Sequence, residues 1–293
     1  MGMDSRTGKK IRLGRILNPV SGRTIIVAAS HAVLTGAPKG LKSVSEMRNS
    51  FGQLSGANGI MLAPGSVDKV EEIFVGRDKP SLIIHMDWKS FGRPIFTPGT
   101  SGISEGNIAQ LTTVENAASC GADAIMTYLY VGQKDNKLEK EEIERNARLA
   151  DECTKYGIAL IIEPRAVDDY MDKTQVENPD LLSWYCRMAA EVGADIVKCI
   201  WPGDAKSYEK VVSSTTVPLV LAGGSAGDDR ILETMELAEM SVKAGGAGVM
   251  FGRRIYSSAS PAAVLAGLSA VVHENATAKV GAQIFSDTKS KIS

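Results

Sequence analysis

The sequence predicts a (β/α)8 TIM barrel, an α/β fold, on three observations. Between residues 23 and 275, eight short aliphatic and β-branched runs alternate with longer amphipathic runs, as in parallel strands joined by helices. The strand runs are almost continuously apolar, which indicates that both of their faces are covered. Eight such units in about 250 residues match the size of this barrel. A doubly wound open sheet is the alternative, but no GxGxxG motif follows the first run, as a dinucleotide site in such a sheet would require.

The predicted strands are residues 24–30, 59–63, 81–87, 122–130, 158–164, 194–201, 217–224 and 247–252. Two of the helices between them carry clear boundary signals. Thr112 and Glu115 form a capping box at the start of the helix before the fourth strand, and Gly121 ends that helix. Another helix has Asn178 as its N-cap, Pro179 in its first turn and Gly193 after its end.

We expect a single barrel domain over residues 1–293, with loosely held tails at 1–15 and 279–293. The alternative is that these ends contact a neighbouring subunit. The tripeptide Gly-Ala-Asp precedes two strands, at 121–123 and 193–195, which indicates that one βα unit is repeated. The longest connections, residues 88–111 and 166–177, follow the third and fifth strands. Long loops at the catalytic face of a barrel are natural lids.

Composition excludes several classes of partner. Thirty-three Lys and Arg against 34 Asp and Glu give a net charge of −1, so no broad field favours nucleic acid or an anionic membrane. No run approaches the roughly 18 apolar residues of a membrane span, and no apolar segment follows the basic N-terminus as in a secretory signal. Four widely spaced cysteines without a CxxC pair predict reduced thiols in the cytoplasm. The sequence has no cluster of carboxylates and histidines, so we expect no catalytic metal site.

Lys198 is the most informative residue, because it interrupts the apolar strand ADIVKCIW. An amine held in apolar surroundings has its ammonium form disfavoured, so its pKa falls and it becomes a nucleophile for a carbonyl substrate. Lys198 is therefore the candidate Schiff-base residue, which needs no cofactor beyond its own covalent iminium. The alternative is a structural lysine paired with a carboxylate at the barrel centre.

Glu163 ends the fifth strand, one strand away from Lys198. A carboxylate there can carry protons to and from the substrate, or it can simply pair with Lys198 or Arg165. Ser30 and His31 end the first strand, and we predict that they assist proton transfer. An ordinary hydrogen-bonded role for His31 remains the alternative.

A phosphate site is predicted where the seventh and eighth strands end. Gly223, Gly224 and Ser225 follow one strand, and Gly252 and Arg253 follow the next. Barrels commonly bind phosphate at these two turns, where bare backbone N–H groups approach the anion and an arginine adds bidentate donors.

Four further residues at strand ends are candidate substrate-binding residues: Asp87, Arg165, Tyr130 and Trp201. Charged side chains there can bind substrate hydroxyl or phosphate groups, and aromatic ones can line the pocket. For Tyr130 and Trp201, ordinary core packing is the alternative.

The sequence resembles the class I, Schiff-base aldolases of the DeoC/LacD type, particularly the branch with archaeal-type fructose-bisphosphate aldolases, aminodideoxyheptulosonate synthases and the autoinducer-2 phosphate thiolase. The resemblance lies in RLGRILNPVSGRTIIVAASHAVLTGAPKGL, GADIVK with the Pro-Gly-Asp after it, VPLVLAGG, GAGVMFGRRIY and VVHENA. It implies that Lys198 is the Schiff-base lysine and that Gly223, Gly224, Gly252 and Arg253 bind phosphate. It also implies a homo-oligomer.

Two positions depart from that family pattern. Ser30-His31-Ala32 stands where the family usually has Asp-His-Gly, and Glu163-Pro164-Arg165 stands where it usually has Tyr-Pro-Arg. The family tyrosine is an acid/base, and a glutamate near its place is similar to what tagatose-bisphosphate aldolases use for proton transfer.

These observations predict a lyase of carbohydrate metabolism that cleaves or forms a C–C bond in a phosphorylated ketose or related sugar phosphate. One alternative is a thiolase that passes an acyl group from a phosphorylated dicarbonyl to coenzyme A. The other alternative is a sensor that binds a sugar phosphate without turnover.

Overall fold

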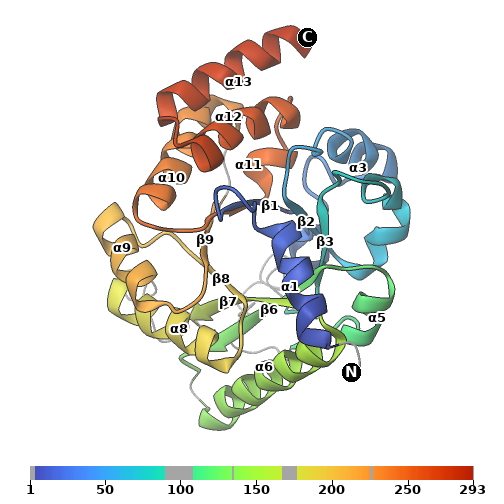
Figure 1. The fold of residues 1–293 in the computed structure, drawn as a ribbon, viewed down its shortest axis with the longest axis vertical. Coiled ribbons are helices and arrows are strands. Elements are labelled where there is room, and N and C mark those ends of the chain that lie inside the picture. Colours follow the sequence, from blue (N-terminus) through green and yellow to red (C-terminus); the bar gives the residue numbers. More distant parts are fainter. Residues whose placement is uncertain (1–3, 90–107, 134, 167–176, 225–226, 293) are drawn as a thin grey trace, which may run out of the picture.

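The computed structural model describes residues 4–292 apart from 90–107, 134, 167–176 and 225–226. Eight parallel strands close into a barrel in the order β1-β10-β9-β8-β7-β6-β3-β2 (Figure 1), which confirms the predicted fold. Most of the two long loops predicted as lids lies outside the described residues. Within the described residues, no helix has the length and apolar character that crossing a membrane requires.

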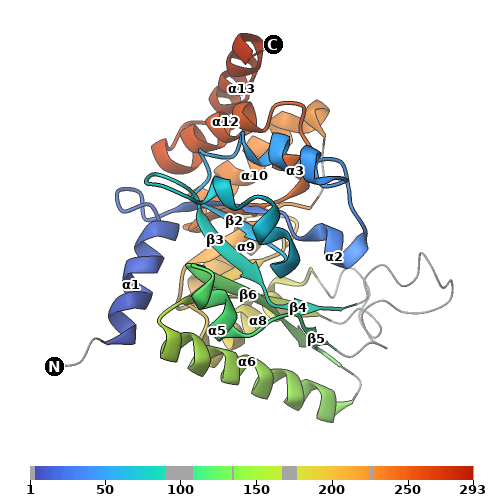
Figure 2. The ribbon, with the colours of Figure 1, turned by 90° about the vertical axis from the view of Figure 1, so that its right-hand side faces the viewer.

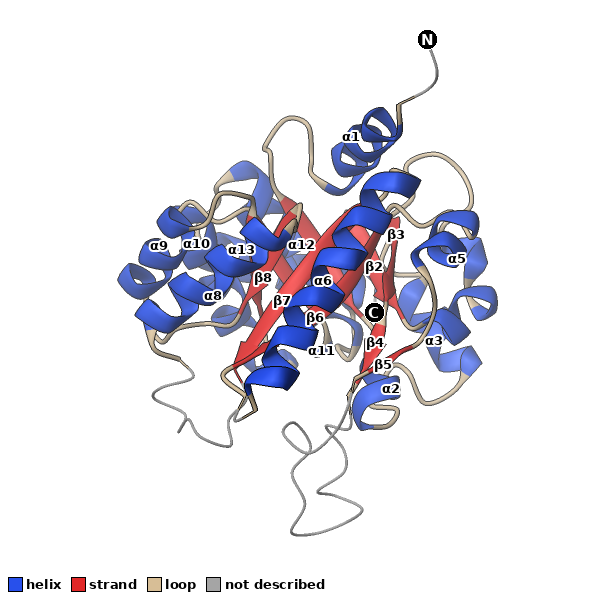
Figure 3. Ribbon diagram, turned by 90° about the horizontal axis from the view of Figure 1, so that it is seen from below, coloured by secondary structure: helices blue, strands red, loops and turns tan. Residues whose placement is uncertain are grey.

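The barrel strands are β1 Thr24–Ala28, β2 Gly59–Leu62, β3 Ser81–His85, β6 Ala124–Val131, β7 Ala159–Ala166, β8 Ile196–Cys199, β9 Leu219–Ala222 and β10 Gly248–Phe251, with a short antiparallel pair, β4 Asp87–Trp88 and β5 Ala109–Gln110, beside them. The α-helices, which surround the strands in Figure 3, are α1 Ser5–Ile16, α2 His31–Thr35, α3 Val44–Phe51, α5 Val114–Ser119, α6 Asn136–Tyr156, α8 Pro179–Val192, α9 Ala205–Ser214, α10 Ile231–Lys243, α11 Arg253–Tyr256, α12 Pro261–Glu274 and α13 Ala278–Ile292. Three short 3-10 helices are η1 Pro64–Lys69, η2 Glu71–Ile73 and η3 Asp228–Arg230.

The capping signals place two helices well. Asn178 accepts a hydrogen bond from the backbone of Asp180, and Gly193 ends α8 in the left-handed conformation, as predicted. The N-cap of α5 is Thr113 rather than Thr112, because the hydroxyl of Thr113 accepts the hydrogen bond from the N–H of Asn116. The predicted helix therefore begins one residue later in the chain.

Each strand contributes to two apolar layers, which explains the continuous apolar runs. On β8, Ile196 belongs to the cluster inside the barrel, whereas Val197 and Cys199 belong to the larger cluster between strands and helices. Ile161 and Ile162 of β7 divide in the same way. Alternation along a strand thus fixes which residues point into the barrel.

The N-terminal segment, expected to be a loose tail, forms α1 and covers the amino-terminal end of the barrel. Figure 2 shows α1 at the end opposite β4 and β5. Arg15 pairs with Asp123 and Lys9 with Asp195, each at 3.0 Å. These two aspartates end the repeated Gly-Ala-Asp tripeptides, so the repeat supplies carboxylates that hold α1.

The C-terminal segment, also expected to be a tail, forms α13 and packs against α10 and α12. Its Phe285 is buried in the core. The helices approach closely at two glycines: a methyl group on Gly267 would lie 2.5 Å from the carbonyl oxygen of Gly281. Both ends of the chain therefore add buried surface to the same domain.

The contribution of α1 can be measured with two isoleucines of that helix. Ile16 is fully buried, and Ile11 is 55% exposed. We expect Ile16→Ala to lower the free energy of unfolding by about 2–5 kcal/mol, because it leaves a cavity. The matched control Ile11→Ala should change it by less than about 0.5 kcal/mol. Urea unfolding measures both, and equal effects would show that α1 does not pack as described.

Candidate active site

Lys198 points into the barrel from β8 and meets a carboxylate. Its Nζ lies 2.7 Å from Oε2 of Glu163 on β7, and the Lys198 side chain is only 10% exposed. The register explains this contact, because Ile162 pairs with Val197 and the next residues along each strand are Glu163 and Lys198. The sequence suggested an amine in apolar surroundings. In the structure the amine is instead paired with a carboxylate inside the barrel.

Glu163 is buried between two cations. Its side chain is 2% exposed, and Oε1 lies 3.1 Å from Nη1 of Arg165. Burial would by itself raise the pKa of this carboxyl, but the charges of Lys198 and Arg165 and their hydrogen bonds outweigh it and lower the pKa. Glu163 is therefore ionised at neutral pH and can accept a proton.

Two tyrosines line the interior beside this pair. Tyr128 on β6 stands opposite Glu163 in the strand register, and Tyr130 stands opposite Arg165. Their ring centroids are 5.4 Å apart, and Lys89 Nζ lies 4.4 Å from the centroid of the Tyr130 ring. Burial raises the pKa of both phenols, so they stay protonated. Tyr130 faces the barrel interior and is fully buried in its apolar cluster.

Asp87, a predicted substrate-binding residue, is held by several groups of the protein. It is 1% exposed, and its Oδ2 accepts hydrogen bonds from Thr127 Oγ1 at 2.5 Å and the Tyr128 N–H at 3.0 Å. Oδ2 also lies 3.2 Å from Nη1 of Arg145 on α6, and Oδ1 lies 3.2 Å from Nε2 of His85. Asp87 therefore ties β4 to β6 and α6.

Trp201 differs from its predicted place. It is half-buried and packs against the cluster between strands and helices, with its ring centroid 5.7 Å from that of Tyr208 on α9. The chain has left β8 before Trp201, so the alternation along the strand no longer determines its direction. Core packing, the alternative considered for this residue, is what the structure has.

The two predicted phosphate turns lie on neighbouring strands, since β9 pairs with β10. A methyl group on Gly223 would lie 2.4 Å from Cδ1 of Phe251, and Gly224 has a φ of +61°, so both positions require glycine. Ser225 lies outside the described residues. Arg253 follows the second turn, and its Nε is buried with no hydrogen-bond partner among the residues that the structure describes.

The neighbouring Arg254 is fully engaged within the protein. It donates to the carbonyl oxygen of Gly223, to Thr234 Oγ1 at 3.0 Å and to Glu233 Oε1 at 2.7 Å. The two consecutive arginines thus differ: Arg254 holds the first turn in place, and Arg253 has a buried donor that a bound anion would satisfy.

Ser30 and His31 lie where β1 passes into α2. Ser30 is 3% exposed and makes no side-chain cap on α2. Burial of His31, followed by the nearby charges of Lys198 and Arg253, lowers the pKa of its imidazole to about 4. His31 is therefore neutral at physiological pH and lies close to both the lysine and the candidate phosphate site.

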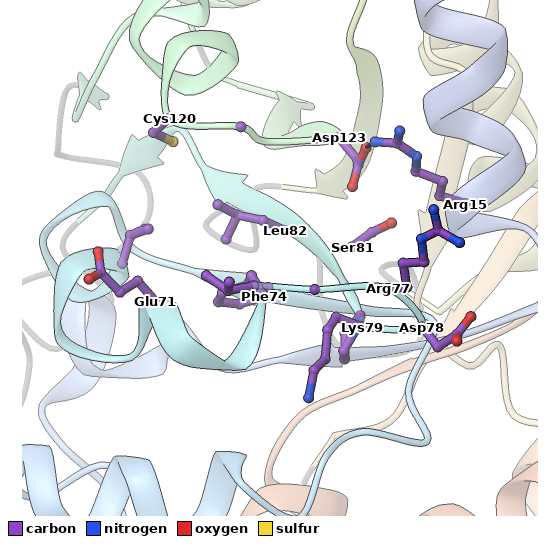
Figure 4. A pocket seen from close by; sticks show the side chains of 15 residues that line it. Arg15, Glu71, Phe74, Arg77, Asp78, Lys79, Ser81, Leu82, Cys120 and Asp123 are labelled. Carbon is purple, nitrogen blue, oxygen red and sulfur yellow. Dashed lines mark hydrogen bonds and ion pairs between the residues drawn. The ribbon is translucent and has the colours of Figure 1, made fainter.

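Figure 4 shows a separate cavity of about 810 Å³ at the amino-terminal end of the barrel. Arg15 of α1, Arg77, Ser81 at the start of β3 and Asp123 are among its lining residues. None of the predicted site residues lines it. The cavity is therefore not the place where Lys198 and Glu163 would meet a substrate.

Sequence reasoning missed Arg145 and the phenol of Tyr256. Arg145 is one of many charged residues of α6, and nothing in its spacing separates it from its solvated neighbours. Tyr256 is the last residue of the segment GRRIY, in which only the glycine and the first arginine were predicted as site residues. Among the described residues, no group of three or more His, Cys, Asp or Glu side chains is placed to hold a metal ion.

The lysine and glutamate pair lies inside a closed barrel, toward the carboxyl-terminal ends of the strands, where barrel enzymes have their active sites. The chain belongs to the DeoC/LacD family of aldolases, whose sequence model matches residues 24–258. This match confirms the predicted family and the aldolase class.

Curated relatives span nearly the whole chain. An uncharacterized aldolase of Saccharolobus solfataricus is 31% identical and covers 92% of this chain and 96% of its own. A 2-amino-3,7-dideoxy-D-threo-hept-6-ulosonate synthase of Halobacterium salinarum is 29% identical, with 92% and 93% covered. A 3-hydroxy-5-phosphonooxypentane-2,4-dione thiolase of an Enterobacter species is 27% identical, with 96% and 87% covered.

Solved structures share the fold. A Schiff-base-forming fructose-1,6-bisphosphate aldolase superposes with a TM-score of 0.73 at 21% identity, covering 90% of this chain and 99% of its own. A fructose-bisphosphate aldolase of Slackia heliotrinireducens has a TM-score of 0.78 at 15% identity, with 97% and 91% covered.

If Asp87 holds these elements together, replacing it should lower the free energy of unfolding more than replacing an exposed aspartate does. Asp87→Ala removes the acceptor of the Tyr128 N–H and one of the two carboxylates beside Arg145, which keeps Glu142 at 2.9 Å. We therefore expect the free energy of unfolding to fall by about 1–3 kcal/mol. Asp68, whose side chain is 66% exposed, serves as the control, and Asp68→Ala should cost less than about 0.5 kcal/mol. Chemical denaturation measures both. A small effect of Asp87→Ala would remove the case for a structural anchor.

Proposed function

We propose that this protein is a class I aldolase that acts on a phosphorylated ketose or related sugar phosphate through a Schiff base on Lys198. The observation that carries the proposal is the Lys198–Glu163 pair, 2.7 Å apart inside the barrel. The register of β7 and β8 brings both side chains to the barrel interior. There the amine can act as a nucleophile and the carboxylate as a base.

Glu163 would manage the protons of the reaction. As a carboxylate it accepts a proton from the Lys198 ammonium, and the free amine then attacks the substrate ketone to form a carbinolamine. The protonated Glu163 returns that proton to the carbinolamine hydroxyl, which leaves as water as the iminium forms. Glu163 is then ionised again beside the cationic iminium, and it can take the proton from the substrate hydroxyl when the C–C bond breaks. Arg165 keeps the carboxylate in position throughout.

The phosphate of the substrate would bind at the turns after β9 and β10. The glycines Gly223, Gly224 and Gly252 leave backbone N–H groups accessible, and Arg253 supplies the charge. Binding energy from this remote group would hold the ketone carbon against Lys198. Ser225 and His31 complete the proposed set.

A thiolase is the second candidate, because relatives at 26–28% identity carry that name. The two activities differ in their acyl acceptor. Product release that requires added coenzyme A would favour the thiolase, whereas release without it favours the aldolase.

We also infer a cytoplasmic enzyme that works as a homo-oligomer without a bound cofactor. All four cysteines are free thiols, which supports a reducing compartment. Light scattering on the purified protein measures the oligomeric state.

The Schiff base can be trapped directly. Incubation with dihydroxyacetone phosphate or a ketose phosphate, followed by borohydride, reduces the C=N bond to a stable secondary amine that mass spectrometry locates. We expect the adduct on Lys198 and none in Lys198→Met. Lys210→Met, at an exposed lysine, should label as the wild type does, and Glu163→Gln should label more slowly. Equal labelling of Lys198→Met would contradict the assignment.

Replacing each of the two consecutive arginines should have a different effect, on phosphate binding for Arg253 and on the free energy of unfolding for Arg254. We expect Arg253→Met to weaken binding of inorganic phosphate at least tenfold, since a charged hydrogen bond contributes about 1.5–3 kcal/mol. Stability without phosphate should hold or rise, because the substitution removes a buried donor that has no partner among the described residues. Arg254→Met should instead lower the free energy of unfolding, because Gly223, Thr234 and Glu233 lose their shared partner. Calorimetric titration and thermal unfolding measure the two effects, and unaltered phosphate binding in Arg253→Met would place the anion elsewhere.

A further inference from the structure

Tyr256 contacts His31 at the edge of the proposed active site. The Tyr256 hydroxyl lies 3.0 Å from Nδ1 of His31, and the two ring centroids are 5.8 Å apart. Tyr256 is 1% exposed, and its carbonyl oxygen accepts a hydrogen bond from Ser50 Oγ at 2.9 Å. The phenol is thus held in place by the fold.

The His31 ring is also confined on a second side. A methyl group on Gly252 would lie 2.6 Å from Cε1 of His31 and 2.4 Å from the carbonyl oxygen of Ala28. With Nδ1 on Tyr256 and Cε1 against Gly252, Nε2 is the ring nitrogen left for a ligand. Within the residues that the structure describes, the hydrogen bond of this ring is made through Nδ1 and leaves Nε2 without a partner.

The charges around His31 come from several strands. Lys198 on β8, Arg253 after β10 and His85 on β3 lower its pKa, and Glu163 on β7 raises it. By contact, the imidazole adjoins Gly252 of the proposed phosphate site and the Tyr256 phenol. A neutral imidazole has one donor and one acceptor nitrogen, so the proton on the ring decides what Nε2 offers.

We propose that Tyr256 is a positioning residue that donates its hydroxyl proton to Nδ1 of His31, so that Nε2–H becomes a neutral hydrogen-bond donor to a substrate oxygen near the phosphate. This inference rests on the proposed function for its substrate but not for its tautomer. A neutral donor polarises a substrate oxygen without adding a charge, a use that neutral histidine has in other enzymes.

The direction of the hydrogen bond follows from the partners available. No other acceptor for the Tyr256 hydroxyl occurs in the described part of the chain. If Nδ1 carried the proton, the buried phenol proton would have no partner, which costs free energy. Burial also raises the pKa of the phenol and keeps it protonated. Donation from Tyr256 satisfies both groups.

The tautomer can be observed without any substrate. The chain has only three histidines, His31, His85 and His273, so long-range ¹H–¹⁵N spectra of their rings can be assigned with His31→Gln. We expect the Nε2–H tautomer of His31, with protonation only near pH 4. Tyr256→Phe should shift the ring toward a tautomer mixture. Tyr208→Phe, which removes another buried hydroxyl, should leave His31 unchanged.

Activity then tests the consequence. We expect Tyr256→Phe to lower kcat/KM about tenfold, the loss of one hydrogen bond, with the larger part in kcat. The same substitution should have no effect in His31→Gln, whose amide Nε2 donates without help from a phenol.

Three results would overturn the inference: an Nδ1–H tautomer in the wild type, an unchanged tautomer in Tyr256→Phe, or equal activity losses in the two backgrounds. Absence of aldolase turnover in the wild type would contradict the proposed function instead, and the spectra would still decide the role of Tyr256.

Discussion

One buried carboxylate organises the catalytic end of the barrel. Removing a charge from water costs several kcal/mol unless it is paired, and Glu163 offsets that cost with Lys198 on one oxygen and Arg165 on the other. These contacts depend on the register of β7 against β8. A slip of one residue would turn Glu163 toward the helices and leave Lys198 alone. The reactive geometry is therefore a property of the whole hydrogen-bonded barrel.

A second buried network supports the first from the other face of β6. Thr127 and Arg145 contact Asp87 between β6 and α6, and the N–H of Tyr128 donates to the same carboxylate. The side chain of Tyr128 then points inward beside Glu163. Because successive residues of a strand face opposite sides, the outer network fixes the backbone of the inner one.

Predictions from the sequence were most successful within the strands, where alternation determines which face each side chain occupies. All eight barrel strands were located, and Lys198 and Glu163 stood out because a charge in a strand covered on both faces has to point inward. Prediction failed where the chain leaves the sheet, as for Trp201, since the alternation of side chains ends there. It also failed for α1, whose polar sequence is held through long-range ion pairs with Asp123 and Asp195 that no local pattern reveals.

Arg253 and Arg254 show how the same residue type at consecutive positions is used in two ways. Arg254 has three partners within the protein, and it contributes to stability whether or not a ligand is present. The buried Nε of Arg253 has no partner among the described residues, which costs the free protein stability. A bound anion would remove that cost and stabilise the folded state by mass action. The unpaired donor is thus what the proposed phosphate site requires. Because Arg253 follows Gly252, which contacts the His31 ring, phosphate bound there would lie near the imidazole that Tyr256 contacts.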